Sequence, residues 1–571
     1  MSAGGRPGLT ARSTSALGAI LLLATASVAA ATAPPMRGTP SWATNETSTG
    51  RRENDLRPVS SLTTYDAHSG AELSEQFTVS VGQQASAIAA APPVYSSTST
   101  RRCSEIPAQN TKDECWCKPG HSQAWASLWF TGAPVTVTVH NSKSWGSWEQ
   151  VVLRPRRANI TMHKINATAL SFVLPPSALG YKLSLESAGQ MDPLAACDDG
   201  FPPIVGDSLM IFADPGSMAP DPGSSAPDTL YFGPGLHDLG GQMVLPANVS
   251  RVYIAGGAWV GGGFITEDAS ASVSISGRGV ISGSAQTFLK DPAGFGPCSY
   301  NGSYCWSLVN LDKGATHRLE GVVLHDPPKY FFRSYAKGVT LHGVKMLGAW
   351  THNTDGVVTG EGGRVTDCFI QSNDDSIKLF TSSMRVSDVV VWQMSNGGVF
   401  QMGWWGSHDQ RDILVERVTV LHADYKTVDD EWARSHPQND AIIDLRGPGG
   451  NTLDPSAAGI YNISNITWRD IVIDSVVHGG GLVRLDLAAA TGSLTGLTFE
   501  RVSVPGAMPS SVATAKGQTI SGLAFVELEV AGSCVKTAAA AGFGSQPASV
   551  GLTFGCSASD RRARSLFSRP R

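Results

Sequence analysis

Three aspartates recur over a short stretch of this chain, namely Asp355 in WTHNTDG and the adjacent pair Asp374 and Asp375 in SNDDSIKLF. Asp374 follows Asp355 by 19 residues, and short strand-like runs separated by turns surround them. If the backbone completes one circuit in about that length, the three carboxyl groups stack on one patch. Clustered carboxyl groups on a rigid scaffold are what acid/base hydrolysis of a glycosidic bond requires. The spacing therefore predicts a catalytic site for sugar-bond hydrolysis.

The electrostatics of such a cluster follow from its composition. Three carboxyl groups so close cannot all ionise independently, so we expect one pKa to rise. The protonated group can protonate a leaving oxygen while its ionised neighbours hold a water molecule. Asn373, just before the pair, predicts a turn or bulge that directs both carboxylates outward onto the surface. Lys378 is expected to temper the negative charge. Alternatively, an Asp-Asp pair is a turn element or a calcium ligand.

Aromatic and polar residues on the same or following circuits are candidates for sugar contacts, because flat sugar faces stack on rings. Trp350 precedes Asp355, whereas Trp404 and Trp405 follow the aspartate pair by about one circuit in FQMGWWGS. The alternative for each tryptophan is a packing role inside the scaffold or at a turn. The other candidate substrate contacts are Lys378, His352, Gln401, Tyr425 and Lys426.

A degenerate internal repeat runs through residues 229–558 and predicts the scaffold. Similar runs begin at Val339, Val365, Val386 and Ile413, with offsets of 26, 21 and 27 residues. Each unit holds two short β runs separated by a Gly, Asp or Asn turn, without a helix between them. Repeats of this kind favour a solenoid whose coils stack as parallel sheets. A propeller would need four strands per ~40 residues and a blade signature. The prediction is a parallel β-helix.

The rest of the chain divides by composition. Residues 1–33 are typical of a secretory signal peptide, in which Arg6 and Arg12 precede an apolar run; an uncleaved anchor is the alternative. Residues 34–103 are predicted to be a low-complexity lead-in. Residues 104–214 alternate like an antiparallel β-sandwich. A Pro/Gly/Ser-rich linker, 215–228, separates it from the β-helix, and 559–571 form a basic tail to which we attach no function.

Charge and cysteines agree with an exported, all-β protein. Charged residues make up 16% of the 571 residues and the net charge is −5, so no basic field for nucleic acid is present. No apolar run after the signal reaches the ~18–20 residues of a membrane span, so we expect a soluble, secreted protein, monomeric and without a metal or other cofactor. Among nine cysteines, Cys534 and Cys556 are suited to a C-terminal disulfide, as are Cys298 and Cys305 to a short loop. Cys103, Cys115, Cys117 and Cys197 are candidates for N-terminal cross-links, Cys368 for a buried free thiol, and seven sequons for glycosylation: Asn45, Asn159, Asn166, Asn248, Asn301, Asn462 and Asn465.

Ordered motifs over residues 120–530 resemble glycoside hydrolase family 49, the dextranase and isopullulanase group. They run LMIFADP, YFGPGLHDL, VYIAGGAWVGGG, GRGVISG, GVVLHDPP, NTDGVV, DDSIKLF, VVVWQ and FQMGWW. The resemblance implies a β-sandwich followed by a right-handed parallel β-helix that cleaves α-glucans internally, with inversion and without metal. It implies Asp374 as general acid and Asp355 and Asp375 as the groups that activate water. Inversion implies acid and base carboxyls about 6.5–9.5 Å apart.

Several alternatives remain open at this point. The segment KTVDDEWARSHPQNDAI after Tyr425 departs from the family, so the substrate is dextran, pullulan or a related polymer. Polygalacturonase-like enzymes share NTDG and the aspartate pair but add Gly-His-Gly and Arg-Ile-Lys strings that this chain lacks. A calcium-dependent polysaccharide lyase would use the aspartates as metal ligands. A carbohydrate-binding β-helix without catalysis would bind glucan and release no reducing ends.

Overall fold

The chain divides into two compact units, Met1–Leu56 and Arg57–Arg571. The computed structural model describes, within the second unit, residues 60–83, 88–98, 121–187, 191–192, 204–216, 219–285, 307–351, 353–394, 396–403, 408–425, 440–446, 460–475, 480–487, 491–514, 518–544 and 550–556. The predicted signal peptide and basic tail lie outside the described residues. So do six of the cysteines and the sequons at Asn45 and Asn301.

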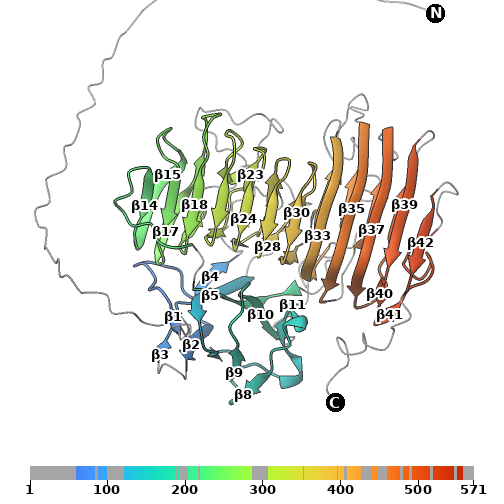
Figure 1. Ribbon diagram of the computed structural model, residues 1–571. Helices are drawn as coiled ribbons and strands as arrows, with labels where there is room; N and C mark the ends of the chain where they lie inside the picture. Colours follow the sequence, from blue (N-terminus) through green and yellow to red (C-terminus); the bar gives the residue numbers. More distant parts are fainter. Residues whose placement is uncertain are drawn as a thin grey trace, which may run out of the picture. The chain divides into compact units, whose positions relative to one another are not determined.

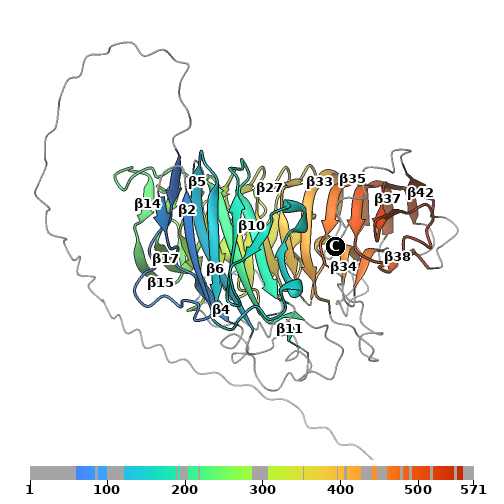
Figure 2. The ribbon, with the colours of Figure 1, turned by 90° about the horizontal axis from the view of Figure 1, so that it is seen from below.

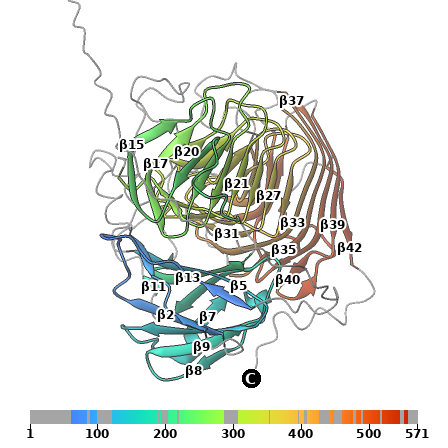
Figure 3. The same cartoon turned by 60° about the vertical axis from the view of Figure 1, so that its left-hand side comes forward.

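The described part before residue 216 is a sandwich of two sheets (Figure 2). One sheet has the order β1-β5-β13-β10-β7, with β4 also paired to β5; the other has the order β3-β2-β6-β9-β8 (Figure 3). A two-stranded pair, β11 and β12, accompanies them. The strands are β1 (Ser61–Thr63), β2 (Phe77–Gln83), β3 (Ile88–Ala90), β4 (Tyr95–Thr98), β5 (Ser122–Thr131), β6 (Val135–Asn141), β7 (Val151–Arg154), β8 (Met162–Lys164), β9 (Ala169–Leu174), β10 (Tyr181–Ser187), β11 (Met191–Asp192), β12 (Ile204–Val205) and β13 (Asp207–Pro215), with short 3-10 helices η2 (Trp148–Gln150) and η3 (Arg156–Ala158).

The sandwich begins earlier in the chain than its predicted boundary at residue 104. Strands β1 to β4 lie in the segment 34–103 that was predicted to be a low-complexity lead-in. In β2 the residues alternate between buried and exposed positions, with Phe77, Val79 and Val81 inside the sandwich core. The alternation is regular but short. Ser, Thr and Gly lie between the apolar residues, so the composition of the segment resembles that of a low-complexity region.

The described strands from residue 229 onward form one continuous sheet in chain order from β14 to β42, and they pair in parallel except for β40 with β41 (Figure 1). In the central coils each strand pairs in parallel with the third strand along the chain, so one coil contributes three strands to three sheets. This is the predicted parallel β-helix. Its strands are β14 (Thr229–Phe232), β15 (Gly235–Val244), β16 (Arg251–Ile254), β17 (Ala258–Ile265), β18 (Ser274–Gly277), β19 (Val280–Ser282), β20 (Ser307–Asn310), β21 (Arg318–Glu320), β22 (Val323–His325), β23 (Tyr330–Ser334), β24 (Thr340–His342), β25 (Lys345–Leu347), β26 (Val357–Thr359), β27 (Arg364–Thr366), β28 (Phe369–Ser372), β29 (Ile377–Lys378), β30 (Arg385–Ser387), β31 (Val390–Gln393), β32 (Phe400–Gly403), β33 (His408–Ala423), β34 (Ala441–Arg446), β35 (Ile460–Ile473), β36 (Gly481–Asp486), β37 (Thr491–Val504), β38 (Ser510–Ala513), β39 (Thr519–Val526), β40 (Glu529–Val530), β41 (Ser533–Cys534) and β42 (Leu552–Gly555).

Ladders of equivalent apolar residues fill the interior of the coils. Along one sheet the register joins Val386 to Val415 and then to Trp468. The ladder continues through Phe499, Phe525 and Phe554, whose rings stack with centroids 4.5 and 5.0 Å apart. Stacked rings at the strand spacing fix the coil register, because a one-residue slip would turn every ring outward. The four β runs used to predict the repeat coincide with β24, β27, β30 and β33 of this sheet.

Buried apolar and charged contacts join the sandwich to the β-helix within this unit. Trp125 and Phe212 of the sandwich share an apolar cluster with Phe369 and Trp392 of the β-helix. Glu186 accepts hydrogen bonds from His422 at 2.9 and 3.0 Å and from Arg154 at 3.0 Å, completing a buried ionic network. Two further buried ion pairs cross the same contact, Lys182 with Asp367 and Lys345 with Asp214. The contact between the sandwich and the β-helix therefore buries several charged groups, each paired with a group of opposite charge.

Two cysteine predictions fall on described residues and are confirmed. Cys534 and Cys556 form a disulfide at the C-terminal end of the β-helix. Cys368 is a buried free thiol, and burial raises its pKa to about 12, so it stays protonated at neutral pH. Among the described residues no helix is long and apolar enough to cross a membrane.

Candidate active site

The three aspartates meet at the start of two neighbouring strands of one β-helix sheet. Asp355 precedes β26, and Asp374 and Asp375 lie in the bend between β28 and β29. Strands β26 and β29 are parallel neighbours with Val357 opposite Ile377, so one coil separates the two sites. Gly356 donates its N–H to the Asp375 carbonyl at 2.9 Å, and a Cβ at Gly356 would lie 2.2 Å from the Ser376 carbonyl oxygen. Only glycine permits this close approach of the two coils.

The cluster predicted from the 19-residue spacing is present in the fold. One oxygen from each of the three carboxyl groups lies within 4.8 Å of the others. The prediction that the carboxylates lie on the surface is wrong, because Asp355 and Asp375 are each 1% exposed and Asp374 is 7% exposed. The bend directs the pair to one side of the coil, and neighbouring coils and side chains cover it there. Burial makes the charges of the cluster interact strongly.

Lys378 lies between two of the aspartates. Its ammonium nitrogen is 2.7 Å from Asp355 Oδ2 and also forms an ion pair with Asp375 Oδ2. The rings of Tyr330 and Phe380 lie 5.5 and 5.2 Å from the same nitrogen. Negatively charged carboxylates and ring faces therefore surround the cation. The expectation that Lys378 tempers the negative charge agrees with these contacts.

Asp374 is held by neutral donors instead. Its Oδ2 accepts a hydrogen bond from Asn396 Nδ2 at 2.7 Å and one from Asn353 Nδ2 at 3.2 Å. Its Oδ1 accepts the backbone N–H of Asp375 at 2.9 Å. Among the described residues, Asp374 forms no ion pair with a lysine, arginine or histidine. The environment of this carboxyl thus differs in kind from that of its two neighbours.

The pKa values reflect this arrangement. Burial, and after it the charge of Asp375, raises the pKa of Asp374 to about 7. Burial, followed by the charge of Asp374, raises the pKa of Asp355 well above its ordinary value, while Lys378 opposes the rise. Since the pKa values of both Asp355 and Asp374 are raised and the two carboxyl groups interact, the cluster keeps at least one proton near neutral pH. The ion pair with Lys378 opposes the rise in the pKa of Asp355, whereas Asp374 forms no ion pair with a cation among the described residues.

The cluster also has the donor set of a cation site. Three carboxylate oxygens within 4.8 Å of one another suit a hard divalent ion. The ammonium group of Lys378 already lies against two of these carboxylates and supplies a positive charge there. A divalent ion at this position would have to displace the lysine from Asp355 and Asp375, so the residues do not fit a resident metal.

The other predicted contacts are placed differently. Gln401 lies opposite Lys378 on the next coil and is fully buried; its Nε2 donates to the Met402 carbonyl, and its Oε1 has no partner among the described residues. Trp350 is 5% exposed and donates its indole N–H to Ser97 of the sandwich at 2.8 Å, so the sandwich anchors its ring. The prediction of a substrate contact by Tyr425 is wrong: its ring belongs to the β-helix core and its hydroxyl donates to the Ala441 carbonyl. The other four predicted contacts lie outside the described residues: His352, Trp404, Trp405 and Lys426.

Two residues of the cluster were not singled out from the sequence. They are Asn353 and Asn396, both of which donate to Asp374. A signal for Asn396 exists, because it follows Asp374 by 22 residues, close to the 23-residue offset between Lys378 and its coil neighbour Gln401. Applying the coil period forward from Asp374 would have placed an amide beside it.

Comparison with known proteins shows which sequences and domains this chain is similar to. Residues 66–216 match the model of the glycosyl hydrolase family 49 N-terminal Ig-like domain, which spans most of the sandwich described above. The chain is also 26% identical to the isopullulanase of Aspergillus niger over 444 residues, which is 72% of this chain and 76% of that protein. The sandwich thus matches a domain of glycoside hydrolase family 49, and most of the chain is similar to an isopullulanase.

A dextranase sequence and a solved structure are also similar to this chain. The dextranase of Arthrobacter globiformis is 26% identical over 355 residues, and the match spans about half the length of each protein, 53% of this chain and 55% of the dextranase. The solved structure of Dex49A from Penicillium minioluteum superposes with a TM-score of 0.63 at 21% identity, covering 86% of this chain and 96% of that one. The structural likeness supports the fold, a sandwich followed by a parallel β-helix.

Proposed function

We propose that this chain hydrolyses internal glycosidic bonds of a neutral, dextran- or pullulan-like α-glucan. The observation that carries the proposal is the cluster of three carboxyl groups, two of which share one lysine while the third is held only by neutral donors. Such an asymmetric cluster separates a protonated acid from ionised bases. The family relatives named dextranase and isopullulanase supply the substrate class.

In the proposed reaction Asp374 is the general acid. Its proton passes to the glycosidic oxygen as the bond from that oxygen to the anomeric carbon breaks. A water molecule forms the new bond to the anomeric carbon and gives its proton to Asp355, whose Oδ1 has no partner among the described residues. Asp375 orients that water and stabilises positive charge on the sugar, while Lys378 holds Asp355 and Asp375 in place through its two ion pairs.

We propose inversion at the anomeric carbon, following the family resemblance. The nearest carboxylate oxygens lie within 4.8 Å, closer than the about 6.5–9.5 Å expected for inverting pairs. Lys378 accounts for part of this difference, since it draws Asp355 and Asp375 together, and Asp374 adjoins Asp375 in the chain. A retaining mechanism would require one ionised carboxylate to leave its lysine and bond covalently to the sugar. The ion pairs of Lys378 oppose that step.

The polar residues that follow the cluster favour a neutral substrate over a uronate. The coil position of Lys378 is occupied by Gln401 on the next coil and by Asp444 on the one after. Arg484, one coil further, already forms an ion pair with Asp440. A pectin hydrolase is therefore the weaker candidate, and a calcium-dependent lyase would need an ion where Lys378 lies.

The proposal includes export, because residues 1–33 are typical of a signal peptide and the chain carries sequons and a disulfide. The test of activity is incubation of the purified protein with dextran, pullulan and polygalacturonate. Release of reducing ends from an α-glucan, unaffected by a chelator, is the expected result. Release from polygalacturonate alone, or an unsaturated product absorbing in the ultraviolet, would contradict the proposal. Binding without reducing ends would indicate a carbohydrate-binding protein.

A further inference from the structure

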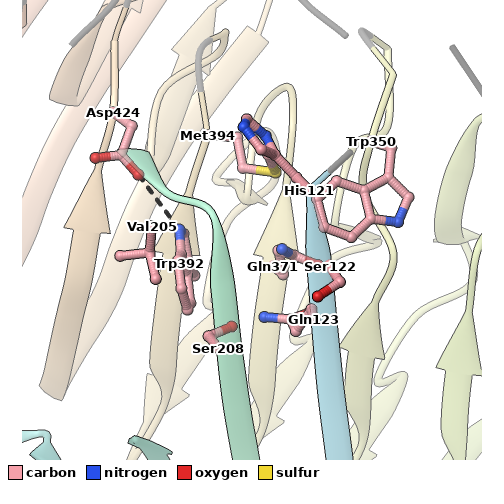
Figure 4. A pocket seen from close by; sticks show the side chains of 10 residues that line it. All are labelled: His121, Ser122, Gln123, Val205, Ser208, Trp350, Gln371, Trp392, Met394 and Asp424. Atoms are coloured by element: carbon pink, nitrogen blue, oxygen red, sulfur yellow. Dashed lines mark hydrogen bonds between the residues drawn. The ribbon is translucent and has the colours of Figure 1, made fainter. Parts of the chain in front are cut away.

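Trp350 links the sandwich to the turn that carries the aspartate cluster. Its indole N–H donates to Ser97 Oγ of β4 at 2.8 Å, and both residues are buried, at 5% and 3% exposure. Figure 4 shows the indole beside β5, the sandwich strand to which β4 pairs. The small cavity drawn there has room for about one water molecule, which is far less than a sugar ring needs. The Trp350 ring is therefore buried against the sandwich and is not open to a substrate at this place.

Gly348 lets the sandwich approach this segment of the β-helix closely. Its φ is 82°, in the left-handed region, and a Cβ there would lie only 3.0 Å from Ser97 Oγ. The backbone N–H groups of Gly348 and Ala349 both donate to Gln371 Oε1, at 2.8 and 3.3 Å. Gln371 lies on β28, the strand that leads into the aspartate pair. The segment is thus held from two sides, by the sandwich and by that strand.

Asn373 extends this link to the aspartates themselves. Its side-chain amide donates to the Trp350 carbonyl at 3.3 Å, and its backbone N–H donates to the Thr354 carbonyl at 3.1 Å. Asn373 directly precedes Asp374 in the chain, and Thr354 directly precedes Asp355. One buried asparagine therefore joins the segments that carry the acid and the base of the proposed reaction, and the Trp350 carbonyl holds its amide.

We propose that Trp350 is a positioning residue for the hydrolytic reaction, through which the sandwich fixes the separation of Asp355 and Asp374. The inference rests on the proposed function, since it takes these aspartates as the catalytic base and acid. Ser97 holds the indole, and the carbonyl of the same tryptophan holds the Asn373 amide. A displacement of about 1 Å between reacting groups can lower a rate by about 10²-fold. The sandwich thereby contributes to catalysis as well as to the fold.

Two changes remove the hydrogen bond from opposite sides. Trp350→Phe keeps a buried ring and loses the N–H donor, whereas Ser97→Ala loses the acceptor. We expect each change to lower kcat on dextran or pullulan by about 10–100-fold with KM nearly unchanged, because the aspartates move while the sugar contacts remain. The double variant should lose no more than the larger of the two single losses, since both changes break the same bond.

Trp145→Phe is the matched control. Trp145 is 2% exposed and donates its indole N–H to the Thr168 carbonyl at 3.1 Å, but it belongs to the core of the sandwich. This change should lower Tm about as much as Trp350→Phe and leave kcat unchanged. Equal losses of kcat in the two tryptophan variants would mean general destabilisation and would overturn the proposal. Unchanged kcat in both Trp350→Phe and Ser97→Ala would overturn it as well.

Crystal structures give a readout that does not depend on activity. In Ser97→Ala we expect the contact between Asn373 and the Trp350 carbonyl to be lost, and Asp355 to be displaced relative to Asp374. Aspartates that keep their positions of the unmodified protein would overturn the proposal. Hydrolysis by the unmodified protein is measured separately. If it cleaves neither glucan while the displacement occurs, the proposed function fails, whereas the link from Ser97 to the aspartates is confirmed.

Discussion

The ammonium nitrogen of Lys378 lies 2.7 Å from Asp355 and also pairs with Asp375, so one cation serves two of the three clustered carboxylates. This relationship makes the cluster asymmetric. Asp374, the third member, has a pKa raised to about 7 because it is buried without such a partner and beside a like charge. The contacts of Asp374 thus differ from those of its two neighbours, and the following predictions apply the proposed roles to that difference.

Removing Lys378 should impair Asp355, the proposed base. In Lys378→Met the pKa of Asp355 rises further, since the ammonium group opposes its rise. We expect kcat/KM on dextran or pullulan to fall by about 10²–10⁴-fold, with the acidic limb of the pH profile displaced to higher pH. Lys345→Met is the control, because it also breaks a buried lysine–aspartate pair, with Asp214 at the sandwich. If both variants lose activity without a change of pH profile, Lys378 has only a structural role.

The acid and the base should respond differently to the leaving group. Asp374→Asn removes the proton donor, so we expect about 10²–10⁴-fold loss on glucan and much smaller loss on an α-glucosyl fluoride, whose leaving group needs no proton. Asp355→Asn should lose activity on both substrates. Single-turnover rates on the two substrates measure this. The reverse pattern would exchange the two roles.

The stereochemical outcome is a separate prediction. Proton NMR during early hydrolysis of an α-glucan should show the β-anomer first, because the proposed water attacks from the face opposite the leaving oxygen. Initial release of the α-anomer would establish retention. In that case the short separation within the cluster would be the geometry of a nucleophile, and Asp355 or Asp375 would form the covalent intermediate.

The fold was more predictable than the environment of the site. The coil period and the 19-residue spacing predicted that Asp355 meets Asp374 and Asp375, because stacked coils bring equivalent positions together. Burial was not predictable, since it depends on which neighbouring segments cover the bend. Tyr425 shows the same limit: it lies just beyond β33, outside any strand, so no alternation along a strand indicated that its ring packs into the core.

Stability should fall as pH rises towards neutral because of Asp374. Its pKa is raised in the folded protein from 3.8 to about 7, so the folded state binds more protons than the unfolded state between these values. The contribution is complete below about pH 4 and is lost as pH passes 7, on the order of a few kcal/mol. Asp374→Asn should therefore have a higher Tm than the unmodified protein at pH 8 and a similar Tm at pH 4. A smaller gain at pH 8 than at pH 4 would contradict this.

Glu186 should have the opposite effect at the contact between sandwich and β-helix. Burial raises the pKa of Glu186, but His422 and Arg154 lower it by more, so that the net value is about 2. Its contribution is present above the ordinary value of 4.5 and is lost as pH falls towards 2. Glu186→Gln leaves Arg154 beside only one carboxylate, and we expect destabilisation of about 3–5 kcal/mol by denaturant unfolding at pH 7. Glu361→Gln, which breaks an exposed pair with Lys337, should leave the stability nearly unchanged, because solvent screens such a pair.

The side-chain amide of Asn353 should lower the pKa of Asp374, the proposed acid. It donates to Asp374 Oδ2 at 3.2 Å, and this hydrogen bond lowers the pKa of that carboxyl. Asn353 has a φ of 59°, a left-handed conformation that glycine adopts without strain, so Asn353→Gly removes the amide and keeps the turn. Because the pKa of Asp374 then rises, the alkaline limb of kcat should move to higher pH, with the loop conformation unchanged.

Asn465→Gly is the matched control for this change. Asn465 also has a left-handed φ, 52°, and also donates to an aspartate, Asp412 Oδ1 at 2.7 Å, but it lies outside the cluster. It should leave the pH profile of kcat unchanged. A shift of the alkaline limb to lower pH in Asn353→Gly would mean that Asn353 accepts a hydrogen bond from a protonated Asp374. The amide would then hold the catalytic proton in place, and its loss would make Asp374 a stronger acid.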